Sequence, residues 1–306
     1  MGKTAWIFPG QGSQTVGMGQ TFLNNPEQLQ AVSRRLGFDL LDAMAAGSNE
    51  ELQRTEVAQP AIVAHAASLA HAYANAGAVP DLVIGHSVGE YAALVVAGVI
   101  DLEEASVLVH ERGKLMSEVK DGTMAAVIGM TDLDEAFHVT EKISASGNLV
   151  QIANYNCPGQ FVISGHVDAI KQAETDLKEA GAKRILQLDV SGAFHSSYMV
   201  PAATRFKDVL ASSPFRPATV EIISNVDADV HTEPEKLKAL LTEQLYAPVR
   251  FEACVRKAID AGVDTFIEFG PTSPLSGLIK RIDSNVTLKQ ATTLEEVAAL
   301  GGEVRA

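Results

Sequence analysis

A serine between two glycines is the first feature of this chain that could do chemistry. Residues 85–89 are Gly-His-Ser-Val-Gly, a G-x-S-x-G pattern. The apolar run at 82–84 predicts a buried strand before it, and the Ala- and Leu-rich segment from Glu90 predicts a helix after it. So sharp a turn leaves no room for side chains on either side of Ser87. The pattern therefore predicts a strained nucleophile at the carboxyl end of a strand, with the backbone N–H of Val88 as an oxyanion donor.

Ser87 needs a general base, because an unassisted hydroxyl is a weak nucleophile at neutral pH. In G-x-S-x-G folds the histidine lies downstream of the serine. His195 follows an expected strand and the glycine turn that starts at Ser191, a setting in which functional residues tend to lie. Spacing indicates no acidic third member, so a backbone carbonyl is an alternative partner for the second ring nitrogen. The other downstream histidines, on or beside expected helices or in a polar loop, are His110, His138, His166 and His231.

A second glycine-rich segment, residues 10–19, follows a strand expected at 4–8. It approaches the G-x-G-x-x-G pattern of nucleotide-dependent oxidoreductases, but Thr15 takes the place of the third glycine, and no clear second strand ending in an acidic residue follows. The alternative is a loop that brings backbone N–H groups, including that of Gln11, to a reacting centre. Metal chemistry has little support, since neither H-E-x-x-H nor C-x-x-C occurs.

Composition excludes several classes of protein. The net charge of −14 over 306 residues argues against a general nucleic-acid binder. Cys157 and Cys254 are the only cysteines, which argues against a disulfide framework and fits a reducing cytosol. No apolar run has the length of a membrane span, and the first residues enter a strand without a signal-peptide pattern. Trp6 stands where a myristoylation signal needs Ser or Thr. A cytoplasmic protein without a membrane segment is expected.

Strands alternate with helices along most of the chain, which predicts an α/β protein with a mostly parallel sheet. From residue 124 the order becomes β-α-β-β-α-β and is complete by residue 190, which predicts a ferredoxin-like unit. We therefore expect an α/β-hydrolase-like catalytic domain from residues 1–122 and 191–306 and an inserted small domain at 123–190. Within the insert, the polar segment 154–160 is expected to be a loop facing a cleft. Helices are expected at 58–76 (with Pro60 in its first turn), 102–119, 133–146, 167–180, 201–211, 235–241, 251–261 and 275–282, and further strands at 124–129, 149–153, 161–165, 184–190, 220–224 and 265–269.

Several of these segments together resemble the malonyl-CoA:acyl carrier protein transacylase family. The resemblance spans residues 4–282 and includes the position of the insert. It departs from common members at Cys157, where Ser is frequent, and at 272–274, where Gly-Lys-Val is common, so no phosphate contact is carried over to that loop. The matching segments are Phe8-Pro9-Gly10-Gln11-Gly12-Ser13-Gln14, Gln59-Pro60, Gly85 to Tyr91, the helix of Arg112, Asn156-Cys157-Pro158-Gly159-Gln160, Ala193-Phe194-His195-Ser196 and Gln244-Leu245-Tyr246.

The resemblance implies an acyltransferase that uses no cofactor. Ser87 would attack the thioester of malonyl-CoA, with His195 as general base and then general acid. The backbone N–H groups of Gln11 and Val88 would bind the oxyanion, and the carbonyl of Gln244 would orient His195. Arg112, which by itself is equally compatible with a solvated surface position, would bind the malonyl carboxylate through two hydrogen bonds. Gln59, His86 and Asn156 would line the site, and Phe194 would leave little room for an α-methyl branch.

The implied partners are CoA and an acyl carrier protein, to whose phosphopantetheine thiol the malonyl group would pass in a ping-pong reaction. Because carrier proteins and this chain are both acidic, docking needs a local basic patch. Candidates are Lys183, Arg184, Lys280 and Arg281, each equally compatible with ordinary solvated charge. A monomer is expected. The pathway served is that of fatty acids or, alternatively, polyketides. The rival functions are a serine thioesterase or hydrolase and a non-catalytic carrier-binding subunit, and Ser87, His195 and Arg112 together argue against the second.

Overall fold

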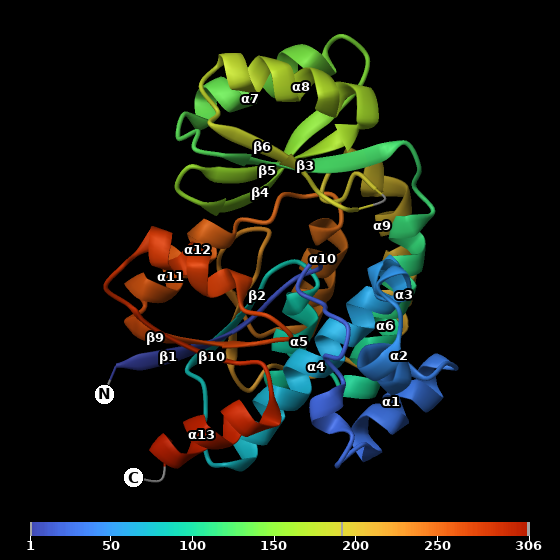
Figure 1. The fold of residues 1–306 in the computed structure, drawn as a ribbon, viewed down its shortest axis with the longest axis vertical. Helices are drawn as coiled ribbons and strands as arrows, with labels where there is room; N and C mark the ends of the chain where they lie inside the picture. The colour runs from blue at the N-terminus through green and yellow to red at the C-terminus, as the bar shows by residue number, and fades with distance from the viewer. Residues whose placement is uncertain (1, 191, 305–306) are drawn as a thin grey trace.

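The computed structural model describes residues 2–190 and 192–304, and it contains two separate sheets (Figure 1). Ser191, the expected first residue of the turn before His195, lies outside the described residues. The larger sheet has the strand order β10-β9-β1-β2-β7-β8, and all its pairs are parallel except β7 with β8. Its strands are β1 (Lys3–Phe8), β2 (Leu82–Gly85), β7 (Glu221–Ile223), β8 (Val230–His231), β9 (Val263–Phe269) and β10 (Thr287–Ala291).

The central strands of this sheet are apolar on both faces, as a parallel sheet covered by helices requires. Ala5 and Ile7 pack on the face covered by α11 (Phe251–Asp260) and α12 (Pro274–Ile282). Trp6 and Phe8 point to the opposite face, where most of the remaining helices lie. These are α1 (Glu27–Leu36), α2 (Leu40–Ala46), α3 (Asn49–Gln53), α4 (Thr55–Asn75), α5 (Gly89–Val96), α6 (Leu102–Ser117), α9 (Val200–Ser212), α10 (Pro234–Gln244) and α13 (Leu294–Val304), with 3-10 turns at Gln20–Phe22 and Ser197–Met199.

The register between β1 and β2 brings two expected functional segments to one edge. Phe8 pairs with Gly85 at the carboxyl ends of the two strands. The loop with Gln11 follows β1, and Ser87 follows β2, so both lie outside the same edge of the sheet. Ligands of open parallel sheets bind at such an edge.

The start of α4 differs from the prediction. This helix begins at Thr55, so that Pro60 lies inside it and not in its first turn. Proline has no N–H to donate to the carbonyl four residues earlier, which belongs to Glu56. The ring of His110 occupies that place, with Nδ1 2.7 Å from the Glu56 carbonyl oxygen. The missing backbone bond is thus replaced by a side chain of α6, which explains why the proline is tolerated.

The smaller sheet is antiparallel, with the strand order β4-β5-β3-β6. Two helices, α7 (Leu133–Ser144) and α8 (Val167–Glu179), cover the face turned away from the larger sheet (Figure 1). Met124, Ala126 and Val162 point from the other face toward the larger sheet and line a cavity there. The strands are β3 (Gly122–Ile128), β4 (Val150–Cys157), β5 (Gln160–His166) and β6 (Arg184–Gln187).

The prediction of a loop at 154–160 is wrong. β4 continues to Cys157, and a tight turn at Pro158 and Gly159, where φ is +75°, leads directly into β5. Polar residues usually indicate an exposed loop, but Asn154 and Asn156 are buried within a strand. β4 is also anchored on its outer edge: Tyr155 N donates to the Val249 carbonyl over 2.8 Å, and Val249 N donates to the Ala153 carbonyl over 2.8 Å. These bonds fix the smaller sheet above the carboxyl edge of the larger one.

A membrane-spanning helix is absent from residues 2–190 and 192–304, since none combines the necessary length with sufficient apolar character.

Candidate active site

Ser87 occupies a strained turn between β2 and α5. Its φ is +53°, a left-handed conformation that residues other than glycine rarely adopt. The flanking glycines are obligatory, because a Cβ on Gly85 would overlap the backbone of Glu90 and a Cβ on Gly89 would overlap the carbonyl of Phe8. The turn thereby presents the Ser87 hydroxyl at the carboxyl edge of the sheet.

A histidine from a distant part of the chain meets this hydroxyl. Ser87 Oγ lies 2.7 Å from His195 Nε2, and His195 Nδ1 lies 2.7 Å from the main-chain oxygen of Gln244. A carbonyl only accepts, so Nδ1 carries the ring proton and Nε2 is free to accept from Ser87. Burial, together with the nearby charge of Arg112, lowers the pKa of His195 to about 3. The ring is therefore neutral at physiological pH and able to act as a base.

Arg112 projects from α6 into the same site and is 1% exposed. Its Nη1 donates to Gln59 Oε1 over 2.8 Å, and its Nη2 donates to Gln244 Oε1 over 3.1 Å and lies 3.5 Å from Ser87 Oγ. Burial lowers the pKa of the guanidinium below its ordinary value. Among residues 2–190 and 192–304, no carboxylate forms an ion pair with Arg112, and its Nε has no hydrogen-bond partner. The guanidinium also lies over the Tyr91 ring, 5.9 Å from its centroid. A buried cation whose hydrogen bonds go to neutral oxygens favours an anionic ligand.

These groups surround a cavity of about 220 Å³. Gln11 and Val88 lie in its wall, and neither backbone N–H has an acceptor among the described residues, so both are available to a ligand oxygen. A cavity this small holds a short acyl group and no long chain. The remaining wall includes His86, Met116, Asn156, Gln160, Leu188, Val190 and Phe194. A larger cavity of about 480 Å³, lined in part by Tyr155, Tyr246 and Arg250, meets the site at His195.

The other expected site residues divide into two groups. His86 and Asn156 lie together in the cavity wall, with His86 Nε2 2.9 Å from Asn156 Oδ1, and Phe194 contributes an apolar ring. The basic residues lie outside the cavity. All four are exposed, and Arg281 Nη1 also donates to Oε1 of Gln160, itself a wall residue, over 2.8 Å.

Asn225, which no sequence pattern indicated, holds both sides of the turn around Ser87. Its Oδ1 accepts from Ser87 N over 2.7 Å, and its Nδ2 donates to the Gly85 carbonyl over 2.7 Å. Its position just after the expected strand at 220–224 could have indicated a site residue. The carboxyl ends of parallel strands share one edge of the sheet, so Asn225 had to lie at the same edge as Ser87. Glu90 was noted as the start of a helix and as part of the matching segment Gly85 to Tyr91, without a role, yet its buried carboxylate contacts Gln244 beneath the site.

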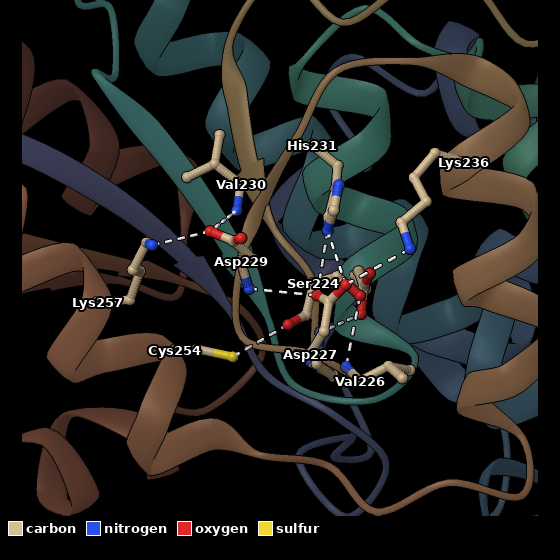
Figure 2. Close-up of polar contacts among 11 residues, drawn as sticks. Ser224, Val226, Asp227, Asp229, Val230, His231, Lys236, Cys254 and Lys257 are labelled. Carbon is tan, nitrogen blue, oxygen red and sulfur yellow. Dashed lines mark hydrogen bonds and ion pairs between the residues drawn. The ribbon is translucent and has the colours of Figure 1, made fainter.

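The turn that carries Asn225 is itself tied to its surroundings (Figure 2). Cys254 Sγ donates to the Ser224 carbonyl over 3.3 Å, His231 Nε2 lies 2.9 Å from Asp227 Oδ2, and Lys257 Nζ lies 2.8 Å from Asp229 Oδ1. These contacts fix the turn from α11 and β8. Within residues 2–190 and 192–304 there is no group of three or more His, Cys, Asp or Glu side chains placed to hold a metal ion.

The fold and the site together are those of an acyltransferase. Residues 5–301 match the family model described as "Acyl transferase domain". The "Malonyl CoA-acyl carrier protein transacylase" of Bacillus subtilis (strain 168) is 45% identical over 293 residues, which are 92% of this chain and 91% of that protein. The chain therefore belongs to the acyl transferase family and, within it, to the malonyl-CoA:acyl carrier protein transacylases, which confirms the resemblance of the sequence motifs.

Solved structures show the same relationship. An acyl carrier protein S-malonyltransferase from Vibrio cholerae has a TM-score of 0.93 at 38% identity, with 97% of this chain and 99% of that chain covered. A second, described as "PlMCAT:AntF (holo): type II PKS acyl-carrier protein in complex with its malonyl-transacylase", has a TM-score of 0.94 at 35% identity and covers 98% and 99%. The mixed α/β fold with a mostly parallel sheet and a separate antiparallel sheet is thus confirmed.

Proposed function

We propose that this protein transfers the malonyl group of malonyl-CoA to the phosphopantetheine thiol of an acyl carrier protein, through a malonyl ester on Ser87. The observation that carries the proposal is Arg112: a buried guanidinium without a carboxylate partner faces a small cavity, 3.5 Å from the serine hydroxyl. A malonyl group brings a carboxylate two carbons from its thioester carbonyl, so one ligand reaches both groups.

The geometry of the site supports the following first half-reaction. His195 Nε2 takes the proton as Ser87 Oγ attacks the thioester carbonyl, and the main-chain oxygen of Gln244 stabilises the ring as it becomes charged. The N–H groups of Gln11 and Val88 bind the oxyanion. As the tetrahedral intermediate collapses, the C–S bond breaks and the CoA thiolate takes the proton from His195. In the second half-reaction the carrier thiol gives its proton to His195 and attacks the ester, and Ser87 recovers its proton.

Selectivity follows from the cost of leaving buried polar groups unpaired. An acetyl group offers no oxygen to Arg112, whereas a malonyl carboxylate accepts two hydrogen bonds from its planar fork. Gln59 and Gln244 hold the guanidinium in place for this pairing. Phe194 in the cavity wall limits the space at the α-carbon. His86 and Asn156 complete the wall and stiffen it through their mutual hydrogen bond.

We further propose that basic residues at one end of the smaller sheet guide the acidic carrier or the phosphates of CoA. Ile128 of β3 pairs with both Gln160 and Arg184, so these three residues share a row and a face of the sheet. Arg281 contacts Gln160 and joins this row from α12. Arg184 and Arg281 thus lie on the side of the sheet that covers the cavity, with Lys183 and Lys280 beside them in sequence.

The remaining expectations are part of the same proposal. Residues 1–122 and 191–306 act as an α/β-hydrolase-like catalytic domain, and residues 123–190 as an inserted ferredoxin-like domain whose open face closes the acyl cavity. The enzyme works as a cytoplasmic monomer without a cofactor and supplies fatty-acid synthesis. Supply of polyketide synthesis is the alternative, which the likeness to PlMCAT with its type II PKS carrier supports.

Intact-mass measurement tests the function directly. The protein is mixed with malonyl-CoA, and an acyl carrier protein is then added. We expect a malonyl adduct that is absent from Ser87→Ala and passes to the carrier. An adduct lost to water at the same rate with or without carrier would favour a hydrolase, and the absence of any adduct would favour a carrier-binding subunit.

A further inference from the structure

A buried carboxylate lies directly beneath the catalytic groups. Glu90, in the first turn of α5, is 1% exposed. Its Oε2 accepts from the side-chain Nε2 of Gln244 over 2.7 Å and from the backbone N of Asn225 over 3.2 Å. Within the described part of the chain, no cation lies at ion-pair distance from it. None of the steps proposed above uses this carboxylate.

Gln244 connects Glu90 with each part of the site. Its main-chain oxygen accepts from His195 Nδ1, and its side-chain Oε1 accepts from Arg112 Nη2 over 3.1 Å. Its Nε2 donates to Glu90 and, over 3.1 Å, to the main-chain oxygen of Ser87. One residue therefore contacts the base, the carboxylate-binding arginine and the backbone of the nucleophile.

The orientation of the Gln244 amide decides whether these contacts form. An amide can rotate so that its oxygen and nitrogen exchange places. After that rotation its oxygen would face the oxygens of Glu90 and Ser87, and its NH₂ would face the guanidinium of Arg112. The Oε2 atom of Glu90 also accepts from the backbone N of Asn225, so an acceptor oxygen faces the amide whether or not the carboxyl is ionised. This oxygen selects the orientation in which the Gln244 amide oxygen points to Arg112.

We propose that Glu90 is a positioning residue, which fixes the side-chain amide of Gln244 and through it the Ser87 backbone and the Arg112 guanidinium. The proposal rests on the proposed function, because it assumes that Arg112 binds the malonyl carboxylate. Glu90 itself touches neither substrate nor reacting atoms.

The proposed role of Glu90 requires an acceptor oxygen at this place, and it does not require a permanent charge. Burial raises its pKa to about 7, against hydrogen bonds from Asn225, Gln244 and Ser224 that favour the ionised form. The carboxyl is thus partly neutral near physiological pH and still accepts from Gln244. Glutamine at this position keeps an acceptor oxygen at the same reach, whereas aspartate keeps the charge and withdraws the acceptor by about 1.5 Å.

The test compares the rates at which malonyl-CoA and acetyl-CoA acylate Ser87 in Glu90→Ala, Glu90→Asp and Glu90→Gln, followed by intact mass. With Ala or Asp, we expect malonyl acylation to fall about 10- to 100-fold, the usual effect of leaving buried donors unpaired. The ratio of malonyl to acetyl rates should fall as well, because Arg112 loses its fixed acceptor. With Gln, both rates should stay within about threefold of the wild type, since the bond is kept.

Glu268 provides a matched control. It is equally buried and accepts from Leu275 N, Ser276 N and Ser276 Oγ at the start of α12, and it contacts none of the catalytic groups. Glu268→Ala should lower thermal stability and leave the malonyl-to-acetyl ratio unchanged. That contrast separates a loss of positioning from a general loss of stability.

Two results would overturn the inference. One is a Glu90→Ala or Glu90→Asp protein with the wild-type ratio of rates, whatever its stability. The other is a Glu90→Gln protein as impaired as Glu90→Ala, which would make charge the required property. If the wild type itself forms no malonyl adduct, the proposed function fails together with the inference. If Glu90→Ala does not fold, the comparison of Asp with Gln decides the question.

Discussion

Replacement of Arg112 by alanine should remove malonyl selectivity without abolishing acylation. The guanidinium is 1% exposed and faces the cavity with two neutral oxygens as partners. Its two charge-assisted hydrogen bonds to a bound carboxylate are worth about 3–5 kcal/mol together at this degree of burial. Because about 1.4 kcal/mol corresponds to a factor of ten, malonyl acylation should slow by about 100- to 4,000-fold. Acetyl acylation, which gains nothing from Arg112, should change by less than about fivefold.

The assay is the initial rate of adduct formation on Ser87 at several concentrations of each acyl-CoA. Arg112→Lys keeps the charge and loses the planar fork, so its malonyl rate should lie between those of the wild type and Arg112→Ala. Thermal unfolding of each variant reports the effect of leaving the oxygens of Gln59 and Gln244 without a donor. An unchanged ratio of malonyl to acetyl rates in Arg112→Ala would refute the carboxylate-binding role, as would equal losses for both substrates.

Three further predictions concern other parts of the molecule. Phe194→Ala should raise methylmalonyl acylation relative to malonyl by about tenfold in a competition followed by mass, and an unchanged ratio would mean that another wall residue sets the limit. Arg184→Glu combined with Arg281→Glu should raise the KM for the carrier protein and leave the rate of acylation by a truncated malonyl thioester unchanged. An unchanged KM for the carrier protein would mean that the carrier docks on another surface. Burial raises the pKa of Glu268 to about 7 from 4.5, so its contribution to stability is full below pH 4.5 and is lost as the pH rises through 7. As the pH rises from 4.5 to 7, the free energy of unfolding of Glu268→Gln, measured with urea, should therefore increase by about 3 kcal/mol relative to that of the wild type. An increase of this difference as the pH falls would contradict the prediction.

Local patterns predicted the elements that carry their own signal. The strand and turn before Ser87, the alternation of strands and helices, and all four strands of the smaller sheet follow from short apolar runs and glycines. No element was predicted between residues 24 and 54, where the structure has three short helices. α1 and α3 are mostly exposed and polar, with only Leu29 and Val32 buried in α1 and only Leu52 in α3, so they carry little signal. α2 is apolar, but its seven residues are too few to show a helical period. β10 and α13 were not predicted either, and contacts with the larger sheet and with α4 stabilise them.

The site shows a similar division. Ser87 lies in a recognisable glycine turn and His195 follows one, and both have positive φ, at +53° and +56°. Asn225 and the side chain of Gln244 carry no such mark, because their importance comes from the neighbours that the sheet order brings to them. Acidic residues are common at the start of helices, so the sequence alone does not distinguish the buried Glu90 beneath Ser87 from an ordinary exposed one.

The position of β1 in the larger sheet has a consequence for how the protein is made. β1 lies between β2 and β9, so this strand gains its second neighbour only after residues 263–269 have been synthesised. Contacts so distant in sequence form late, because loop closure over long stretches is entropically costly. The smaller sheet, whose strands all lie between residues 122 and 187, can form before the chain is complete. His195, Asn225 and Gln244 follow Ser87 by 108, 138 and 157 residues. A nascent chain therefore carries the proposed nucleophile before the groups that contact it, and the proposed chemistry has to wait until the sheet has closed.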